Sequence, residues 1–199
     1  LGVQSEDVVA GFVSNGSEAI VASLATLSLG AIWTSCSPDF GVQGILDRFR
    51  QTNPKVLIAA QSTRYNNKSI DLTYRVNGLL SELPSITAII VFPGACPDHI
   101  SGPIHHPGCR IVDFDTGISG NHPLKFAATS FNHPGFVLYS SGTTGVPKCI
   151  VHSQGGALIQ LVKEHRYHVD IKAFERVFYY TTCGWMMWNW LLACLASQA

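Results

Sequence analysis

Short apolar runs alternate with amphipathic segments along the first half of the chain. The apolar runs lie at residues 8–13, 31–34, 56–60 and 86–92 and are interpreted as strands; the last is a β-branched run of the kind buried on both faces. Three intervening segments place apolar residues at helical spacing: Ile20, Leu24 and Leu27; Val42, Ile45, Leu46 and Phe49; and Leu72, Val76, Leu79, Leu80 and Leu83. Because strands that alternate with helices form parallel sheets, the pattern predicts an α/β fold around a largely parallel sheet.

Residues that favour helix ends flank the first two amphipathic segments. Asn15 is followed three positions later by Glu18, which is typical of a helix start. Gly30 is the predicted end of this first helix. Asp39 is the predicted cap of a second helix that begins near Val42.

The regular alternation weakens between residues 93 and 134, which we interpret as mainly connecting loop with one strand at residues 109–114. Farther along, the apolar pattern predicts strands at residues 136–139, 149–152 and 177–181. It also predicts a break at Gly155-Gly156 and a helix through residues 158–166. A buried helix is predicted within residues 188–196.

Five of the eight histidines lie in the loop-rich region: His99, His105, His106, His122 and His133. They have no cysteine or carboxylate at a recognised metal-ligand spacing and no HExxH motif. We therefore expect structural or solvated histidines rather than a metal site.

Composition narrows the classes of partner. The chain is 46% hydrophobic, and its 13 basic and 13 acidic residues cancel, so no general field attracts nucleic acid or an anionic membrane. Six cysteines without a CxxC pair suit reduced thiols in a cytosolic protein. There is no signal-peptide pattern, and the apolar end is too short to span a bilayer. We expect a cytoplasmic protein with small-molecule partners, on a chain that looks cut at both ends.

The strongest chemical signal is the segment SSGTTGVPK at residues 140–148. Its two glycines let backbone N–H groups approach an anion, its four hydroxyls donate hydrogen bonds, and its lysine neutralises charge. This combination predicts contact with the phosphates of a nucleotide. A Walker loop does not fit, because Pro147 stands where glycine is required and Cys149 where Ser or Thr binds magnesium. A simple hairpin turn remains the alternative.

The segment resembles the phosphate-loop signature of the adenylate-forming superfamily, which contains acyl-CoA synthetases, luciferases and the adenylation domains of peptide synthetases. Residues 30–41, 148–156 and 182–190 look like the acetate and acetoacetate branches, and the last of these is closest to the acetoacetate branch. The resemblance covers essentially the whole chain. It implies that residues 1–199 are part of the large N-terminal AMP-binding domain, without the rest of that domain or the small C-terminal domain.

The resemblance also implies the roles of individual residues. The residues it assigns to the ATP phosphates are Ser140, Ser141, Gly142, Thr143, Thr144, Gly145 and Lys148. Lys148 is the residue expected to act in catalysis, by neutralising charge. No metal ligand is assigned to the chain.

A second group of residues belongs to the expected acid pocket and its surroundings. Trp185, Met186 and Met187 are expected to line the pocket for the acid, with Trp188 and Trp190 facing the core instead. We expect His152 to pack beside the site. It is not a general base in this hypothesis, because a carboxylic acid is already ionised near neutrality.

The implied reaction is activation of acetoacetate with Mg-ATP to an acyl-adenylate, followed by transfer to the thiol of CoA, which would feed lipid synthesis. One alternative is a ligase for acetate or another short acid, differing in the pocket after Trp185. Another is a non-catalytic remnant, because the family's adenine and ribose sites and its C-terminal lysine are not found in this chain. The isolated chain is expected to bind ATP weakly and to make no acyl-CoA.

Overall fold

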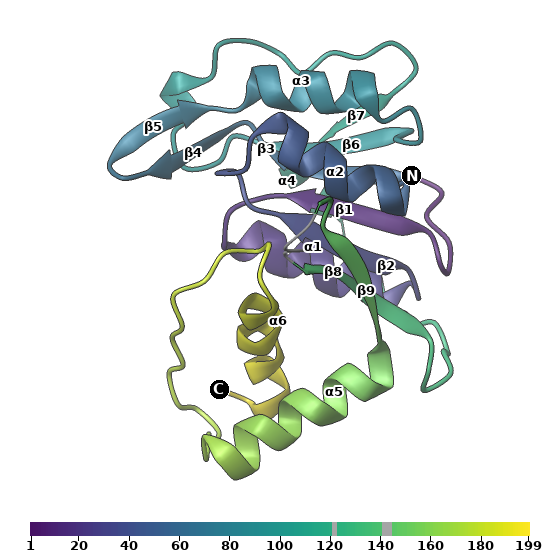
Figure 1. The fold of residues 1–199 in the computed structure, drawn as a ribbon, viewed down its shortest axis with the longest axis vertical. Coiled ribbons are helices and arrows are strands. Elements are labelled where there is room, and N and C mark those ends of the chain that lie inside the picture. The colour runs from purple at the N-terminus through teal and green to yellow at the C-terminus, as the bar shows by residue number, and fades with distance from the viewer. Residues whose placement is uncertain (121–122, 141–144) are drawn as a thin grey trace.

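A computed structural model describes residues 1–120, 123–140 and 145–199. They form one seven-stranded sheet with helices on both faces (Figure 1) and a separate two-stranded hairpin. The strand order is β7-β6-β3-β1-β2-β8-β9, and every neighbouring pair is parallel except β8 with β9. The α/β fold with a largely parallel sheet is therefore confirmed.

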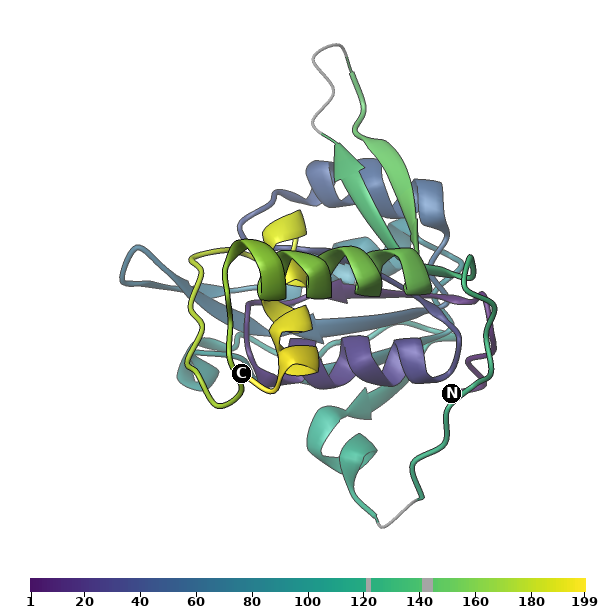
Figure 2. The same cartoon turned by 90° about the horizontal axis from the view of Figure 1, so that it is seen from below.

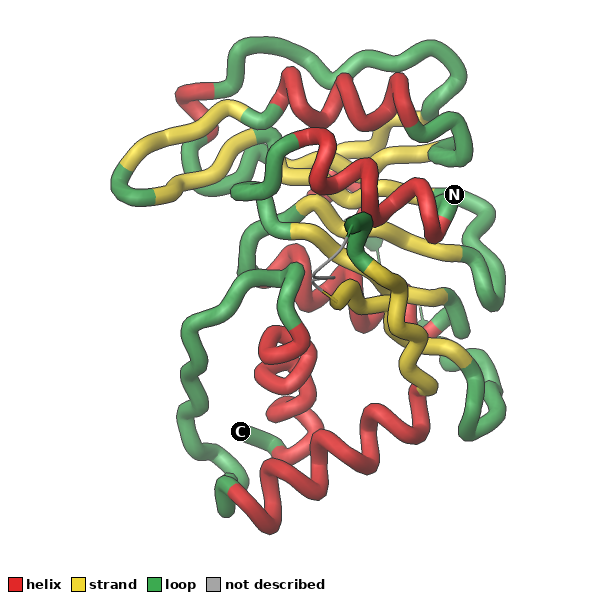
Figure 3. Tube along the Cα trace, viewed as in Figure 1, coloured by secondary structure: helices red, strands yellow, loops and turns green. Residues whose placement is uncertain are grey.

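The strands of this sheet are β1 (Val8–Phe12), β2 (Ile32–Cys36), β3 (Val56–Ala60), β6 (Ala88–Phe92), β7 (Arg110–Asp113), β8 (Pro134–Ser140) and β9 (Lys148–Ser153). The α-helices are α1 (Ser17–Ser28), α2 (Val42–Thr52), α3 (Thr73–Glu82), α4 (Phe114–Ile118), α5 (Gln154–Lys163) and α6 (Met186–Ala193). Short helical turns follow β6, α5 and α6: η1 (Pro97–His99), η2 (Glu164–His168) and η3 (Cys194–Ser197). Figure 3 shows α2 and α3 on one face of the sheet.

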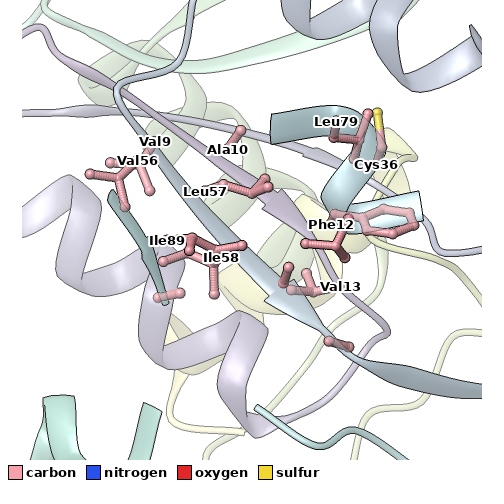
Figure 4. Close-up of a cluster of buried hydrophobic side chains, with 14 of the residues drawn as sticks. Val9, Ala10, Phe12, Val13, Cys36, Val56, Leu57, Ile58, Leu79 and Ile89 are labelled. Carbon is pink, nitrogen blue, oxygen red and sulfur yellow. The ribbon is translucent and has the colours of Figure 1, made fainter. Parts of the chain in front are cut away.

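The core lies along the central strands, where the apolar runs predict it. Phe12 of β1 and Leu57 of β3 are fully buried. Figure 4 shows them beside Leu79 of α3 and Ile89 of β6. Burying such side chains stabilises the fold by about 1.5–3 kcal/mol each. No helix within the described ranges is long and apolar enough to span a membrane.

The apolar faces predicted for α2 and α3 are buried as expected, whereas the prediction for α1 is wrong. In α1 the buried residues are small: Ala19, Ala22, Ser23 and Thr26. Leu24, which the helical spacing places on one apolar face with Ile20 and Leu27, is 45% exposed. The two buried hydroxyls donate within the helix, from Ser23 Oγ to Ile20 O at 2.9 Å and from Thr26 Oγ1 to Ala22 O at 2.7 Å. A helix can therefore bury polar residues against a sheet when each finds a backbone acceptor.

Both predicted N-caps are wrong. Gly16 caps α1 and Gly41 caps α2, each without a side-chain hydrogen bond. Asn15 Oδ1 instead accepts a hydrogen bond from Trp188 Nε1 at 2.9 Å, because a tertiary contact competes for the same oxygen. The predicted end of α1 is confirmed, since Gly30 has φ of 71° and its N–H donates to Leu27 O at 3.0 Å.

The sequence patterns missed an antiparallel hairpin between β3 and α3. It consists of β4 (Ser62–Tyr65) and β5 (Lys68–Asp71). Asn66 and Asn67 join the strands with φ of 50° and 60°. Asparagine tolerates this left-handed region, so the Asn-Asn pair was the available signal for a tight turn.

Two predictions near the C-terminus are also wrong. Gly155 and Gly156 do not break the chain but form the first turn of α5, where Ser153 Oγ accepts a hydrogen bond from Gly156 N at 3.2 Å. This cap holds the helix start despite the glycines. Residues 177–181 form an exposed loop rather than a strand, because no strand within the described ranges pairs with them. The predicted helix around Trp188 is confirmed as α6.

Candidate functional site

The predicted phosphate-binding segment joins two paired strands at the edge of the sheet. Ser140 ends β8 and lies opposite Lys148, which begins β9. Ser140 Oγ lies 3.5 Å from Lys148 O. Figure 2 shows these two strands projecting beyond the helices. The two ends of the segment are thus fixed next to each other.

Part of the predicted phosphate set lies outside the described residues: Ser141, Gly142, Thr143 and Thr144. Among the described members, Lys148 is exposed and Ser140 is half-buried. Gly145 has φ of 152°, and apart from its chain neighbours no atom of the described residues lies within 4 Å of the position that a Cβ would take there. A ligand can therefore approach the backbone of Gly145 without meeting a side chain from the part of the chain that is described.

The pairing of β8 with β9 divides the hairpin into two faces. Phe136 pairs with His152, and Ser140 pairs with Lys148. Paired residues of antiparallel strands lie on the same face, and residues two apart along a strand share it. Ser140, Lys148 and His152 therefore belong to one face, which we call the front face, and Tyr139 belongs to the back face.

The back face is anchored to the body of the protein. The hydroxyl of Tyr139 lies 2.8 Å from Thr34 Oγ1, and burial raises the pKa of this phenol. The guanidinium of Arg48 in α2 lies over the ring of Tyr139, 5.7 Å from its centroid. Gln51 Nε2 donates to Pro147 O at 2.7 Å. Because α2 holds both strands, the front face is presented in a fixed orientation.

A cavity of about 390 Å³ lies against the front face. Helices α5 and α6 form its other walls. Its lining residues are Phe136, Leu138, Val151, His152, Ser153, Gly156, Ala157, Gln160, Leu161, Met186 and Asn189. Ser140 and Lys148, the two ends of the predicted phosphate segment, thus lie on the same face of the hairpin as this cavity.

The residues predicted for the acid pocket are only partly brought to this cavity. Met186 lines the cavity, Met187 is half-buried, and Trp185 is 64% exposed. Trp188 lies in the core as predicted, 1% exposed, with its ring centroid 6.4 Å from that of Trp33. Trp190 is half-buried and meets the ring of His165 edge-on.

Asn189 was missed by the sequence patterns. It is one of the residues that line the cavity and is 6% exposed. Neither Nδ2 nor Oδ1 finds a hydrogen-bond partner among the residues that the structure describes. The available signal was a lone amide within the apolar segment MMWNWLLA.

Titratable side chains elsewhere give no metal centre. The part of the chain that is described contains no group of three or more His, Cys, Asp or Glu able to hold a metal ion. His133 Nε2 lies 2.7 Å from Gly30 O, a structural contact, whereas His122 lies outside the described residues.

All six cysteines are free, and burial raises the pKa of Cys36 and Cys183 to about 12. These two thiols are therefore poor nucleophiles.

Comparison with known families and proteins gives a consistent result. The family model of the AMP-binding enzymes matches residues 1–199. The chain is 48% identical to the acetoacetyl-coenzyme A synthetase of Rhizobium meliloti (strain 1021) over all of this chain and 30% of that protein. It is 41% identical to the acetoacetyl-CoA synthetase of Mus musculus with the same coverage. The chain thus spans about 30% of the length of these relatives.

Two solved structures superpose on almost the whole length of this chain. The acetoacetyl-CoA synthetase from Streptomyces lividans superposes with a TM-score of 0.90 at 41% identity, over 99% of this chain and 29% of the other. A luciferase-like enzyme from the mealworm Zophobas morio has a TM-score of 0.75 at 20% identity, over 99% of this chain and 41% of the other, a likeness of fold alone.

Proposed function

Because this chain belongs to the family of AMP-binding enzymes, we propose that the intact protein is an acid–thiol ligase that converts acetoacetate to acetoacetyl-CoA. The observation that carries the proposal is the match to acetoacetyl-CoA synthetases along the whole chain, at 40–48% identity in vertebrate and bacterial relatives. ATP, as its Mg²⁺ complex, and CoA are the proposed co-substrates.

The reaction proceeds in two displacements. An oxygen of the acetoacetate carboxylate forms a bond to the α-phosphorus of ATP, and the bond from that phosphorus to pyrophosphate breaks. The sulfur of CoA then bonds to the carboxyl carbon of the acyl-adenylate, AMP leaves, and the thiol proton passes to solvent. Both displacements move negative charge among phosphate oxygens, so a fixed cation and N–H donors can accelerate them.

The hairpin residues fit the phosphate role. Lys148 is exposed at the start of β9, on the same face as the cavity. Its ammonium would neutralise the charge that builds on the phosphates, while Gly145 offers an accessible backbone. Ser140 and residues 141–144 complete the proposed set. Mg²⁺ bound to the triphosphate would supply further charge neutralisation.

The cavity on the front face fits the role of acid pocket. Its volume of about 390 Å³ exceeds that of a four-carbon acid, and Met186 forms part of its wall. Trp185 and Met187, the sequence neighbours of Met186, are proposed as further pocket residues, although neither lines this cavity. Pocket shape would set the choice of acid. His152 packs beside the substrate without taking a proton.

Residues 1–199 would then form part of the N-terminal AMP-binding domain. The product, an activated β-keto thioester, would supply acyl groups for lipid synthesis in the cytosol.

Acid-dependent pyrophosphate exchange into ATP by the intact protein tests this function. We expect exchange with acetoacetate and much weaker exchange with acetate, because the two acids differ in the part that enters the pocket. Exchange with acetate but not with acetoacetate would assign the protein to acetate instead. No exchange with any short acid would contradict a ligase and favour a non-catalytic protein that binds nucleotide.

A further inference from the structure

Helix α2 contacts the hairpin of the predicted phosphate segment through two side chains that lie one turn apart. Arg48 places its guanidinium over the ring of Tyr139 in β8. Gln51 forms hydrogen bonds with Pro147 and Cys149. Residues three apart share one side of a helix, and Tyr139 pairs with Cys149 on the back face of the hairpin. One side of α2 therefore supports both strands where the phosphate segment begins and ends.

The side-chain amide of Gln51 uses both of its polar atoms. Its Nε2 donates to the backbone oxygen of Asp47 in α2 at 2.6 Å and to that of Pro147 at 2.7 Å. Its Oε1 accepts a hydrogen bond from the thiol of Cys149 at 3.5 Å. The bond to Asp47 holds the amide against its own helix. The other two bonds therefore tie the hairpin to a fixed point.

The two bonds to the hairpin lie on either side of Lys148. The oxygen of Pro147 belongs to the peptide unit that contains the nitrogen of Lys148, and Cys149 is the next residue. Side chains alternate between the two faces of a strand, so Lys148 lies on the front face while Cys149 meets α2 on the back face. Gln51 thus fixes the backbone from which the lysine side chain extends, without contacting its ammonium.

Placement of this backbone bears directly on chemistry at the phosphates. A fixed charge accelerates a reaction only when it lies where negative charge develops. The stem of lysine is flexible, so the point from which it extends has to be held by other groups. A misplacement of about 1 Å can lower a rate by about 10²-fold.

We propose that Gln51 is a positioning residue, which holds the backbone on both sides of Lys148 so that the lysine ammonium meets the phosphates of ATP during formation of the acyl-adenylate. This inference rests on the proposed function and deepens it, because it assigns control of the phosphate segment to a helix 96 residues away in the sequence. Gln51 does not touch the substrate and acts through Lys148.

The experiment measures acetoacetate-dependent pyrophosphate exchange by the intact protein, before and after Gln51→Met. Methionine has a similar length and helix propensity but has no N–H to donate. We expect kcat to fall about 10-fold and KM for ATP to change less than about threefold, because the lysine acts on charge that builds in the transition state. Gln43→Met is the matched control, since Gln43 is also exposed on α2 and donates to Asp47 Oδ1 at 2.6 Å within the helix. Its kcat should stay within about twofold of the parent.

A double-mutant cycle with Lys148→Ala separates positioning from a general structural role. Because Gln51 acts through Lys148, Gln51→Met should lower kcat less than about twofold when residue 148 is already alanine. A lower unfolding temperature would affect both backgrounds alike and leave this comparison intact.

The outcomes distinguish this inference from the proposed function. Equal losses of kcat in the two backgrounds, or full activity of Gln51→Met, would overturn the inference while an active parent keeps its function. Full activity of Lys148→Ala would also overturn it, because Gln51 would then have no charge to position. A parent protein without exchange on any short acid would contradict the proposed function itself, and the inference with it.

Discussion

Lys148 owes its position to its neighbours rather than to contacts of its own. Pro147 and Cys149, on either side, are both linked to Gln51 of α2, at 2.7 Å and 3.5 Å. The side chain of Lys148 is exposed and forms no ion pair with any residue that the structure describes. Its charge is therefore held at a fixed point of the hairpin and is available to a ligand.

Replacing Lys148 should therefore affect chemistry and not stability. For Lys148→Ala in the intact protein we expect kcat of acetoacetate-dependent pyrophosphate exchange to fall about 10²- to 10³-fold, because a fixed charge at the reacting phosphates is lost. The unfolding temperature should not change. Lys125→Ala is the control, since Lys125 is also an exposed lysine and lies in the loop before β8. Full activity of Lys148→Ala would remove this lysine from the proposed site.

At the scale of elements, one carboxylate joins three segments near the β4–β5 hairpin. Asp71, the last residue of β5, accepts hydrogen bonds from Thr73 N at the start of α3 at 2.8 Å and from Ser101 N at 2.9 Å. Burial acts to raise the pKa of this carboxyl, but the hydrogen bonds from Ser101 and Thr73 outweigh it and lower the pKa to about 2. The ionised form is thus the one that stabilises the fold.

Because of Asp71, the free energy of unfolding should therefore vary with pH in the acid range. Because the pKa is lower in the folded protein than its ordinary value of 3.8, the stabilisation is present above that value and is lost as the pH falls through about 2. Asp71→Asn should lower the unfolding temperature at pH 7, and the difference from the parent should shrink below about pH 4. Asp115→Asn in α4, an exposed site, is the control. A difference that is the same at pH 7 and pH 3 would contradict this role.

Elements with strong periodic patterns could be predicted from the sequence, and those set by tertiary partners could not. Strands β1, β3 and β6 and helices α2 and α3 were predicted because their apolar residues are large and regularly spaced. The buried face of α1 was not, because it consists of small residues and hydroxyls that bond within the helix. Residues 177–181 have the composition of a strand but lack a partner strand in the described ranges.

The candidate site shows the same division. The phosphate segment could be identified from a short sequence motif, because its glycines, hydroxyls and lysine lie within nine consecutive residues, 140–148. Asn189 could not be recognised in this way, because its place in the wall of the cavity depends on β8, β9 and α5, which form the other walls. Its unpaired amide becomes visible only when these elements are assembled.

At the scale of the whole molecule, the chain spans about 30% of the length of its relatives. It includes the hairpin and the cavity of the candidate site, whereas the family's adenine and ribose sites are not recognised in its sequence. Half of a substrate site binds its ligand weakly, because fewer contacts offset the entropy lost on binding.

We accordingly expect the isolated 199-residue chain to bind ATP weakly and to form no acyl-CoA. Calorimetric titration with ATP and a thioester assay with acetoacetate and CoA would check this. The intact protein, assayed in parallel, is the positive control. Robust thioester formation by residues 1–199 alone would contradict the assignment of the remaining steps to residues outside this chain.

The hydrogen bond from Trp188 to Asn15 joins residues 173 positions apart, and the bond from Ser35 Oγ to Cys183 O spans 148. Contacts of such long sequence separation form late in folding, because a long loop must close before they contribute. We therefore expect helix α6 to pack onto the sheet after the central strands have paired. During synthesis on the ribosome, the phosphate hairpin would emerge before α6, and this wall of the cavity would be put in place after the strands that it covers.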